Sequence, residues 1–249
     1  MSAVPVALDV RKLTVRFGGI VALSEVDLTV AKGSRHGILG PNGSGKTTLF
    51  NAISGLNTPA SGTIRLHDTD VTARPARARA KMGLARTFQI TSLFPSLTVR
   101  DNVAMATRMA AGVAGNWWTP ARGQVAANDD AGAMLDRLRI GHLAGRTVRS
   151  LGYGEQRQLE IAMALATRPS VLLLDEPTAG LSNAETTALT DLVRTLPHDL
   201  TVLIIEHDLG VIFELTDQLT VLQNGIMIAS GPSAQIREDP IVKEVYLGR

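Results

Sequence analysis

The sequence has no cysteine, no long apolar run and almost no excess of charge. Without cysteine, the 249 residues form neither disulfides nor thiolate metal sites. The formal net charge of +2 gives no reason to expect nucleic acid as a partner. The apolar fraction of 45% is enough for a substantial core, which is compatible with one large α/β domain or two small ones.

Membrane-spanning and export signals are also absent from the sequence. A spanning helix needs about 18 consecutive apolar residues, and the strongest apolar runs, 171–174 and 202–205, have the length of strands. Residues 1–5 contain no basic segment followed by an apolar one, so we expect no signal peptide. We therefore expect a cytosolic chain that does not cross a membrane.

One stretch carries a specific chemical signal, the pattern G-x-x-x-x-G-K-[ST] of a phosphate-binding loop. It runs Gly40-Pro41-Asn42-Gly43-Ser44-Gly45-Lys46-Thr47-Thr48. Its glycines let backbone N–H groups approach an anion closely, while Lys46 suits the β- and γ-phosphates and the Thr47 hydroxyl suits Mg²⁺. The chance alternative is a glycine-rich turn before Lys-Thr. A strand-like run at 35–39 and a helix predicted over 46–54 favour a nucleotide site.

Two antiparallel strands are predicted on either side of Gly18-Gly19, because apolar residues alternate with polar ones there. The apolar positions are Leu13, Val15 and Phe17, then Val26, Leu28 and Val30. Phe17 ends its strand just before the glycine pair. Two interpretations stay open for it: a core residue, or an aromatic face that contacts an adenine ring.

The middle of the chain predicts a strand at Ile64 and Leu66, a helix over 75–81 and a strand entering a loop at 85–89. Thr98 and Asp101 form a capping-box pattern for a helix over about 99–111. A loop is predicted over 111–123, with Trp117 and Trp118 in local packing or a partner contact. The next helix has its expected apolar side at Ala133, Met134, Leu138 and Ile140.

Basic residues gather in the same region, at Arg65, Arg74, Arg77, Arg79, Lys81 and Arg86. A solvated helix face is the interpretation that we favour for them over a phosphate or partner patch.

Beyond residue 170 the pattern alternates between strand and helix. The continuous apolar runs 171–174 and 202–205 are typical of parallel strands buried on both faces. A helical stripe lies between them, and Asn224-Gly225 predicts a tight hairpin near the end.

Polar side chains follow four of these predicted strands: the loop at Gly40, Gln89, Asp175-Glu176 and His207. Ligands of open α/β sheets bind beyond the carboxyl ends of the strands. Asp175 suits Mg²⁺ through water, and Glu176 suits the orientation or deprotonation of an attacking water. His207 either holds that water or the γ-phosphate, or is a surface histidine. The set fits phosphoryl transfer.

A further segment opens a helix after a loop, with the sequence Leu151-Gly152-Tyr153-Gly154-Glu155-Gln156-Arg157-Gln158. It resembles the signature motif of ABC-type ATPases, and the other motifs occur in that family's order over nearly the whole chain. The resemblance implies that ATP is sandwiched between the phosphate-binding loop of one subunit and residues 151–155 of another. It also implies that Phe17 stacks on adenine and that Gln89 senses γ-phosphate, Mg²⁺ and the transmembrane partner.

The fold that this resemblance implies is a single nucleotide-binding domain over residues 1–249. A P-loop NTPase (RecA-like) core, with an N-terminal antiparallel β subdomain, would comprise 1–89 and 166–249. An inserted α-helical subdomain at about 90–165 would carry the signature.

Two positions depart from the family pattern. Gly152 stands at the usual signature serine, so a hydroxyl toward the partner's γ-phosphate is missing, while the N–H groups of Tyr153 and Gly154 remain. Ser182 stands where an acidic residue or asparagine is usual, which bears on communication between subunits.

Within the family, several segments look like the longer ATPase subunit of branched-chain amino-acid importers: residues 85–89, 153–162, 205–208 and 246–248. Such systems combine two ATPase subunits at the cytoplasmic face of the membrane with two permeases and a periplasmic binding protein. Three alternatives stay open: an importer of another solute such as amides or urea, a soluble ABC ATPase that transports nothing, and a small-molecule kinase. The kinase would leave the signature segment unexplained.

Overall fold

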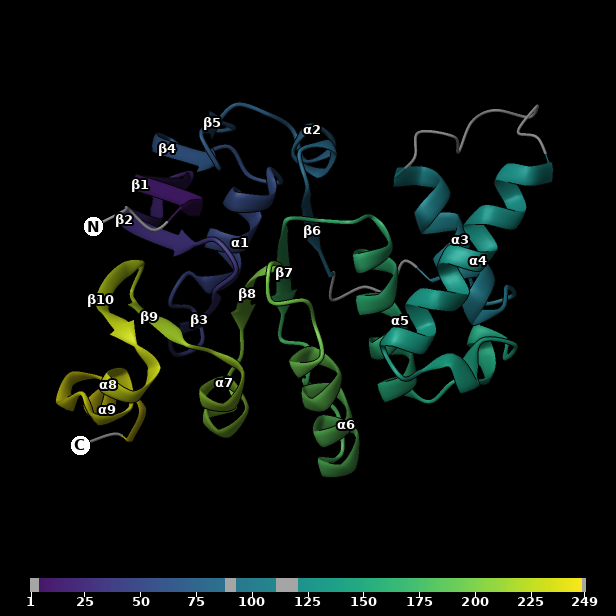
Figure 1. Cartoon of the computed structure of the whole chain (residues 1–249). Coiled ribbons are helices and arrows are strands. Elements are labelled where there is room, and N and C mark those ends of the chain that lie inside the picture. Colours follow the sequence, from purple (N-terminus) through teal and green to yellow (C-terminus); the bar gives the residue numbers. More distant parts are fainter. Residues whose placement is uncertain (1–4, 88–92, 111–120, 248–249) are drawn as a thin grey trace. The chain divides into compact units, whose positions relative to one another are not determined.

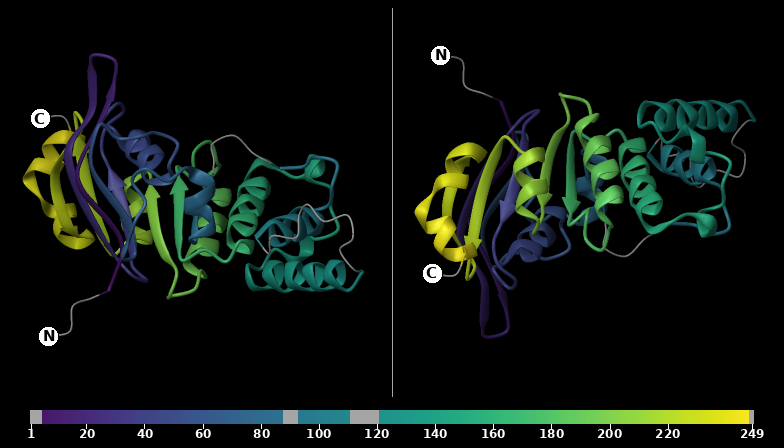
Figure 2. Two further views of the ribbon diagram at one scale, coloured as in Figure 1. Left: turned by 90° about the horizontal axis from the view of Figure 1, so that it is seen from above. Right: turned by 90° about the horizontal axis from the view of Figure 1, so that it is seen from below.

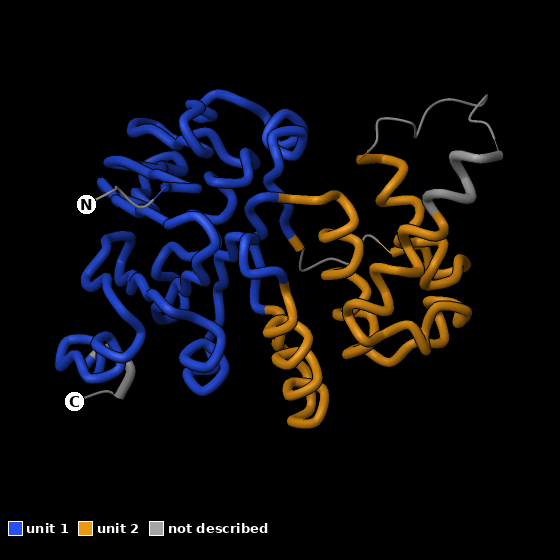
Figure 3. Tube along the Cα trace, in the orientation of Figure 1, with its two compact units in different colours: residues 1–86, 170–176, 197–249 blue, residues 87–169, 177–196 orange. Residues whose placement is uncertain are grey.

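The computed structural model describes residues 5–87, 93–110 and 121–247. The chain divides into two compact units (Figure 3). Unit 1 comprises residues 1–86, 170–176 and 197–249, and unit 2 comprises residues 87–169 and 177–196. The functional subdivision expected from the sequence stays a prediction. In the described part of the chain, no helix is both long and apolar enough to cross a membrane.

A six-stranded sheet with the order β10-β9-β3-β8-β7-β6 forms the centre of unit 1 (Figure 1). Its strands are β3 (Arg35–Leu39), β6 (Leu84–Arg86), β7 (Val171–Asp175), β8 (Thr201–Ile205), β9 (Gln218–Gln223) and β10 (Ile226–Pro232). All of these pair in parallel except β10, which forms a hairpin with β9 through Asn224-Gly225. Every residue of β7 and β8 is buried, as their continuous apolar runs predict.

An antiparallel sheet of unit 1 has the order β2-β1-β4-β5. Its strands are β1 (Val6–Phe17), β2 (Ile20–Ala31), β4 (Ser61–Leu66) and β5 (Thr69–Asp70). Figure 2 shows β1 and β2 as one long hairpin (purple). The predicted alternation is confirmed at Leu13, Val15 and Val26, which are buried. Gly18 takes the positive φ of 58° that the tight turn requires.

Side-chain alternation along β3 divides the core of unit 1 into two clusters. Ile38 belongs to a cluster with the antiparallel sheet and with Leu49, Phe50 and Ile53 of helix α1 (Lys46–Ser54). Leu39, on the opposite face, belongs to a second cluster. That cluster draws on α7 (Leu209–Leu215), α8 (Ser233–Glu238) and α9 (Pro240–Leu247). Helix α1 is therefore anchored by burial on one face of the sheet.

Unit 2 is helical. It contains α3 (Val99–Ala110), α4 (Ala121–Arg137), α5 (Tyr153–Ala166), α6 (Asn183–Arg194) and two short 3₁₀ helices, Gly141–Leu143 and Val148–Ser150. Helix α3 packs against both α4 and α5. The predicted capping box at the start of α3 is confirmed: the Asp101 N–H donates to the Thr98 hydroxyl at 3.1 Å, and the carboxylate reaches back to Thr98.

Two predictions for this region were wrong in detail. Helix α4 begins at Ala121, so the predicted loop does not extend to Gly123. The buried side of α4 includes Ala131 and Leu135, whereas Ala133 is exposed. The prediction was wrong at Ala133, because a short alanine fits either side, but Leu138 and Ile140, which follow α4, are buried as predicted. Trp117 and Trp118 lie outside the described residues.

Candidate functional site

The polar residues predicted to follow parallel strands do so at one edge of the central sheet. The Gly40 loop follows β3, Asp175-Glu176 ends β7, and His207 comes after β8. These three strands are neighbours in parallel register, so their carboxyl ends meet at the same edge (Figure 1). Gln89, which would follow β6, lies outside the described residues.

The phosphate-binding loop depends on glycine at two positions. A Cβ on Gly40 would lie 2.3 Å from the Leu222 carbonyl oxygen and 2.4 Å from the Ser44 Oγ. Gly45, with a φ of 104°, is the N-cap of α1, and a Cβ there would lie 2.6 Å from the Leu23 Cδ2. The loop therefore packs directly against the β9–β10 hairpin and strand β2, which fix its shape.

Hydrogen-bond donors dominate this loop. Among the described residues, no side chain caps the first turn of α1, and the buried Ser44 hydroxyl has no hydrogen-bond partner. Lys46 is folded over the loop, with its Nζ donating to the carbonyls of Gly40 at 2.6 Å and Pro41 at 3.1 Å. Burial lowers the pKa of Lys46, against the opposing effect of Glu176 and Asp175. Such a set of donors fits a polyphosphate.

A metal ion at this site would depend on the nucleotide for part of its ligands. No group of three or more His, Asp or Glu side chains that could hold a metal occurs in the residues that the structure describes. The Asp175 carboxylate is buried and the Thr47 residue is exposed at the first turn of α1. Mg²⁺ is typically bound by one or two protein oxygens together with substrate phosphates and water. Asp175 and Thr47 fit that donor set.

Glu176 has an unusual backbone conformation. Its φ of 45° is left-handed, and such a conformation costs about 1–3 kcal/mol for a residue other than glycine. Its N–H donates to the Ile205 carbonyl at 2.9 Å, which joins the end of β7 to the end of β8. Residues in such strained conformations cluster at active sites and ligand-binding sites.

His207 lies at the solvent-accessible end of β8. Its side chain is 59% exposed, and its Nδ1 is 3.8 Å from Oε2 of the buried Glu206. The same Glu206 oxygen accepts a hydrogen bond from the His207 N–H at 3.2 Å. Both interpretations of His207, a residue that holds water or phosphate and a surface histidine, agree with this position.

Phe17 is not a core residue, because it is 50% exposed at the end of the β1–β2 hairpin. It pairs with Ile20, and further along β2 the carbonyl of Ala22 and the side chain of Leu23 lie beside Gly45. The hairpin therefore carries an exposed aromatic ring on the strand pair that contacts the phosphate-binding loop. This placement favours the adenine contact.

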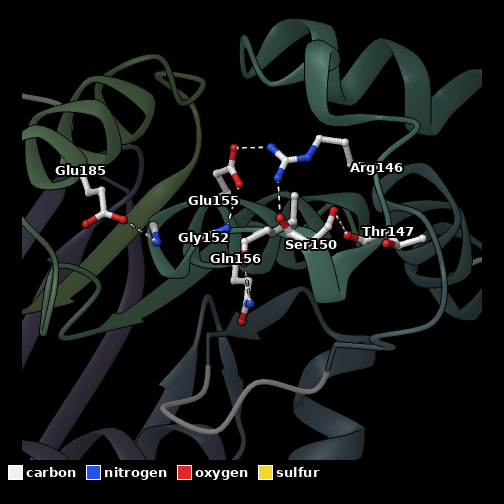
Figure 4. Close-up of polar contacts among 9 residues, drawn as sticks. Arg146, Thr147, Ser150, Gly152, Glu155, Gln156 and Glu185 are labelled. Atoms are coloured by element: carbon white, nitrogen blue, oxygen red, sulfur yellow. Dashed lines mark hydrogen bonds and ion pairs between the residues drawn. The ribbon is translucent and has the colours of Figure 1, made fainter.

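The signature segment begins helix α5 of unit 2, with Gly152 as the N-cap (Figure 4). The Gly152 N–H donates to Glu155 Oε2 at 2.8 Å, and Arg146 Nη1 contacts Glu155 Oε1 at 2.7 Å. Gly152 has no hydroxyl, so only this half of a capping box forms. Tyr153 is 44% exposed. Gly152 and Tyr153 are therefore exposed at this turn, whereas Gly154 is buried and its N–H, which was expected to remain available to the partner's phosphate, is occupied.

Sequence reasoning missed Glu185, which joins the signature segment to α6 (Figure 4). Its Oε1 accepts a hydrogen bond from the Gly154 N–H at 3.1 Å, and a Cβ on Gly154 would lie 2.8 Å from the Glu185 Cγ. Hydrogen bonds from the Ser182 hydroxyl, the Ser182 N–H and the Gly154 N–H lower the pKa of Glu185. The Ser-x-x-Glu pattern at 182–185 is a capping box, which could have revealed Glu185 as part of the start of α6 but not its contact with Gly154.

The expectation of one solvated basic face was wrong for two arginines. Arg79 is 1% exposed, and the Arg86 side chain is 7% exposed. Arg86 Nη2 lies 2.7 Å from Asp175 Oδ2, so it belongs to the surroundings of the proposed metal-binding carboxylate. Only contacts with the distant helix α1 and with Asp175 distinguish these two arginines from their exposed neighbours in the basic stretch.

Comparison of the sequence with known protein families supports a nucleotide-binding site at this sheet edge. A family model described as "ABC transporter" matches residues 23–179, and one described as "Branched-chain amino acid ATP-binding cassette transporter" matches residues 227–249. The chain belongs to the ABC transporter family, as one of its ATP-binding proteins. This confirms the family and the fold class predicted from the motifs.

Two curated relatives resemble the chain over nearly its whole length. It is 39% identical to the high-affinity branched-chain amino acid transport ATP-binding protein BraF of Pseudomonas aeruginosa, with 97% of each chain covered. It is 40% identical to the corresponding protein LivG of Escherichia coli K12, again with 97% of each chain covered.

Solved structures give the same fold. The ADP conformation of an ATP-binding cassette of an ABC transporter superposes with a TM-score of 0.83 at 29% identity, covering 98% of this chain and 99% of that one. A nucleotide-free ATP-binding cassette from an ABC transporter gives a TM-score of 0.82, also at 29% identity, covering 98% and 100%.

Proposed function

We propose that this chain is the ATP-hydrolysing subunit of an importer that moves branched-chain amino acids across the cytoplasmic membrane. The observation that carries the proposal is the match over 97% of both chains to proteins named as branched-chain amino acid transport ATP-binding proteins. The family model matching residues 227–249 supports the same solute class. The loop at Gly40, with its hydrogen-bond donors, supports the binding of ATP.

In this proposal each predicted site residue has its own role in binding or hydrolysing ATP. The N–H groups of the loop and Lys46 bind the triphosphate, and Phe17 stacks on the adenine. Thr47, Asp175 and Gln89 hold Mg²⁺, which when bound neutralises charge on the transferred phosphoryl group. Glu176 orients the attacking water and takes its proton.

His207 steadies that water against the γ-phosphate. Positioning and charge stabilisation are most of what phosphoryl transfer requires.

The proposed assembly contains a second ATPase subunit, two transmembrane permeases and, indirectly, a solute-binding protein. Residues 151–155 close on ATP held by the partner ATPase subunit, and Gln89 contacts the permease. The domain division follows the same roles: a core of residues 1–89 and 166–249 hydrolyses ATP, and residues at about 90–165 carry the signature. The chain lies on the cytoplasmic face of the membrane and binds no nucleic acid.

Uptake measurements test the solute class. Cells that lack the gene should lose uptake of labelled leucine, and expression of the wild-type chain should restore it. The variant Lys46→Ala, which removes the phosphate-binding cation, should fail to restore it. Labelled urea serves as the comparison solute. Unchanged leucine uptake in the deletion strain, or a loss confined to urea, would contradict the proposal.

A further inference from the structure

Helix α1, all of whose residues are described, has no basic residue in its own last turn. Two buried arginines from later in the chain reach this end instead. Arg79, on helix α2 (Ala76–Lys81), donates from Nη1 to the carbonyls of Ala52 at 2.6 Å and Ile53 at 2.7 Å. These carbonyls belong to the negative end of the helix dipole, so the cation stabilises the helix that follows the phosphate-binding loop.

Arg86, at the end of β6, contacts the same helix through side chains. Its Nη1 donates to Asn51 Oδ1 at 2.7 Å and to Ser54 Oγ at 3.0 Å, and its Cζ lies 5.7 Å from the centre of the Phe50 ring. The guanidinium therefore contacts three side chains of α1.

Arg86 differs from Arg79 in a second contact. Its Nη2 donates to Asp175 Oδ2 at 2.7 Å, and the two side chains are 7% and 1% exposed. The planar fork of a guanidinium can direct separate N–H groups to two partners at fixed angles, which a lysine ammonium on a flexible stem cannot reproduce. One buried cation therefore joins α1 to the carboxylate at the end of β7.

We propose that Arg86 is a positioning residue of the nucleotide site, which fixes the Asp175 carboxylate relative to helix α1. The guanidinium then helps to keep a constant spacing between the loop that binds phosphate and the carboxylate that binds Mg²⁺. The proposal rests on the function proposed above for its nucleotide and metal. Groups that hydrogen-bond a metal-binding carboxylate typically change metal affinity 10–100-fold when they are replaced.

Matched substitutions separate this role from simple stabilisation of α1. Arg86→Lys and Arg86→Gln remove the fork that joins α1 to Asp175. Arg79→Lys is the control, because it makes the same substitution at another buried arginine that contacts α1, but through main-chain carbonyls and not through Asp175. Binding of the non-hydrolysable ATP analogue AMP-PNP is measured by calorimetry, first in EDTA and then over a Mg²⁺ titration, together with the melting temperature.

The Arg86 variants should bind AMP-PNP in EDTA within about twofold of the wild-type affinity, and the Mg²⁺ concentration for half-maximal enhancement should rise about 10–100-fold. Arg79→Lys should lower the melting temperature and leave that Mg²⁺ concentration unchanged. Equal Mg²⁺ shifts in the Arg79 and Arg86 variants, or none in the Arg86 variants, would overturn the inference.

A double-mutant cycle keeps the test valid if Arg86→Gln does not fold. The effects of Arg86→Lys and Asp175→Asn on the Mg²⁺ titration should be strongly non-additive, because both remove the same contact. Additive effects would contradict the inference. A wild-type protein that binds no AMP-PNP with Mg²⁺ present would instead contradict the proposed function, and the inference with it.

Discussion

The histidine behind the phosphate-binding loop should make the stability of this protein fall at mildly acidic pH. His36 lies on β3, four residues before Gly40, and is 4% exposed. Its Nε2 is 2.9 Å from the Thr220 hydroxyl, which in turn is 2.9 Å from the Ser230 hydroxyl. Burial lowers the pKa of His36 from 6.5 to about 4, because the imidazolium would lose its hydration.

The sign of the effect follows from proton uptake on unfolding. Between the two pKa values the unfolded chain binds a proton that the folded chain excludes, so stability is lost as the pH falls through this window. The difference between a pKa of 6.5 and one of about 4 corresponds to about 3 kcal/mol in full. Between about pH 7 and about pH 5 the loss should be about 2 kcal/mol.

Urea unfolding monitored by circular dichroism at several pH values measures this loss, and His36→Gln isolates it. Glutamine can hydrogen-bond Thr220 but does not titrate. As the pH falls from about 7 to about 5, the free energy of unfolding of the wild type should therefore decrease by about 2 kcal/mol more than that of the variant. Parallel curves for the two proteins between about pH 7 and about pH 5 would refute the reasoning.

Three further substitutions should have separable effects. Arg79→Met should lower the free energy of unfolding by about 3 kcal/mol in urea titrations, because buried carbonyls lose a charged donor; a loss below about 1 kcal/mol would contradict this. Ser182→Ala should cost about 1 kcal/mol, since it removes the N-cap of α6, and a neutral result would show that the cap does not contribute. Phe17→Ala should weaken ATP binding about tenfold in calorimetry, because the adenine loses its stacking partner. The free energy of unfolding should stay unchanged, because the ring is half-exposed. Equal ATP affinity in the variant and the wild type would show that Phe17 does not contact the nucleotide.

The parts of the fold that the sequence predicted are those determined by local spacing. The phosphate-binding loop has fixed glycine positions, and a Cβ at Gly40 or Gly45 would collide with neighbouring atoms. The buried strands β7 and β8 are continuous apolar runs, and their polar ends lie at the sheet edge because parallel strands share a direction. The grouping of Gly40, Asp175-Glu176 and His207 at one edge of the sheet could be predicted for the same reason.

The parts that the sequence did not predict depend on contacts between distant segments. Arg79 and Arg86 occur in a basic stretch typical of a solvated face, and only the packing of α1 beside them makes them buried. Glu185 contacts Gly154 across 31 positions of sequence, which no local pattern specifies. The N-terminus of α4 was misplaced because alanine and glycine give a weak periodicity.

The association of ATPase subunits tests the central claim most directly. Glu176→Gln keeps the shape of the side chain but cannot take a proton from water, so ATP should bind without being cleaved. We expect this variant, co-expressed with the proposed companion ATPase subunit, to retain ATP and elute as a dimer in light-scattering chromatography with ATP and Mg²⁺. With ADP, or with Lys46→Ala added, it should elute as separate subunits. If the ATP-treated variant retained no nucleotide and stayed dissociated, the claim that ATP joins two such domains would be wrong.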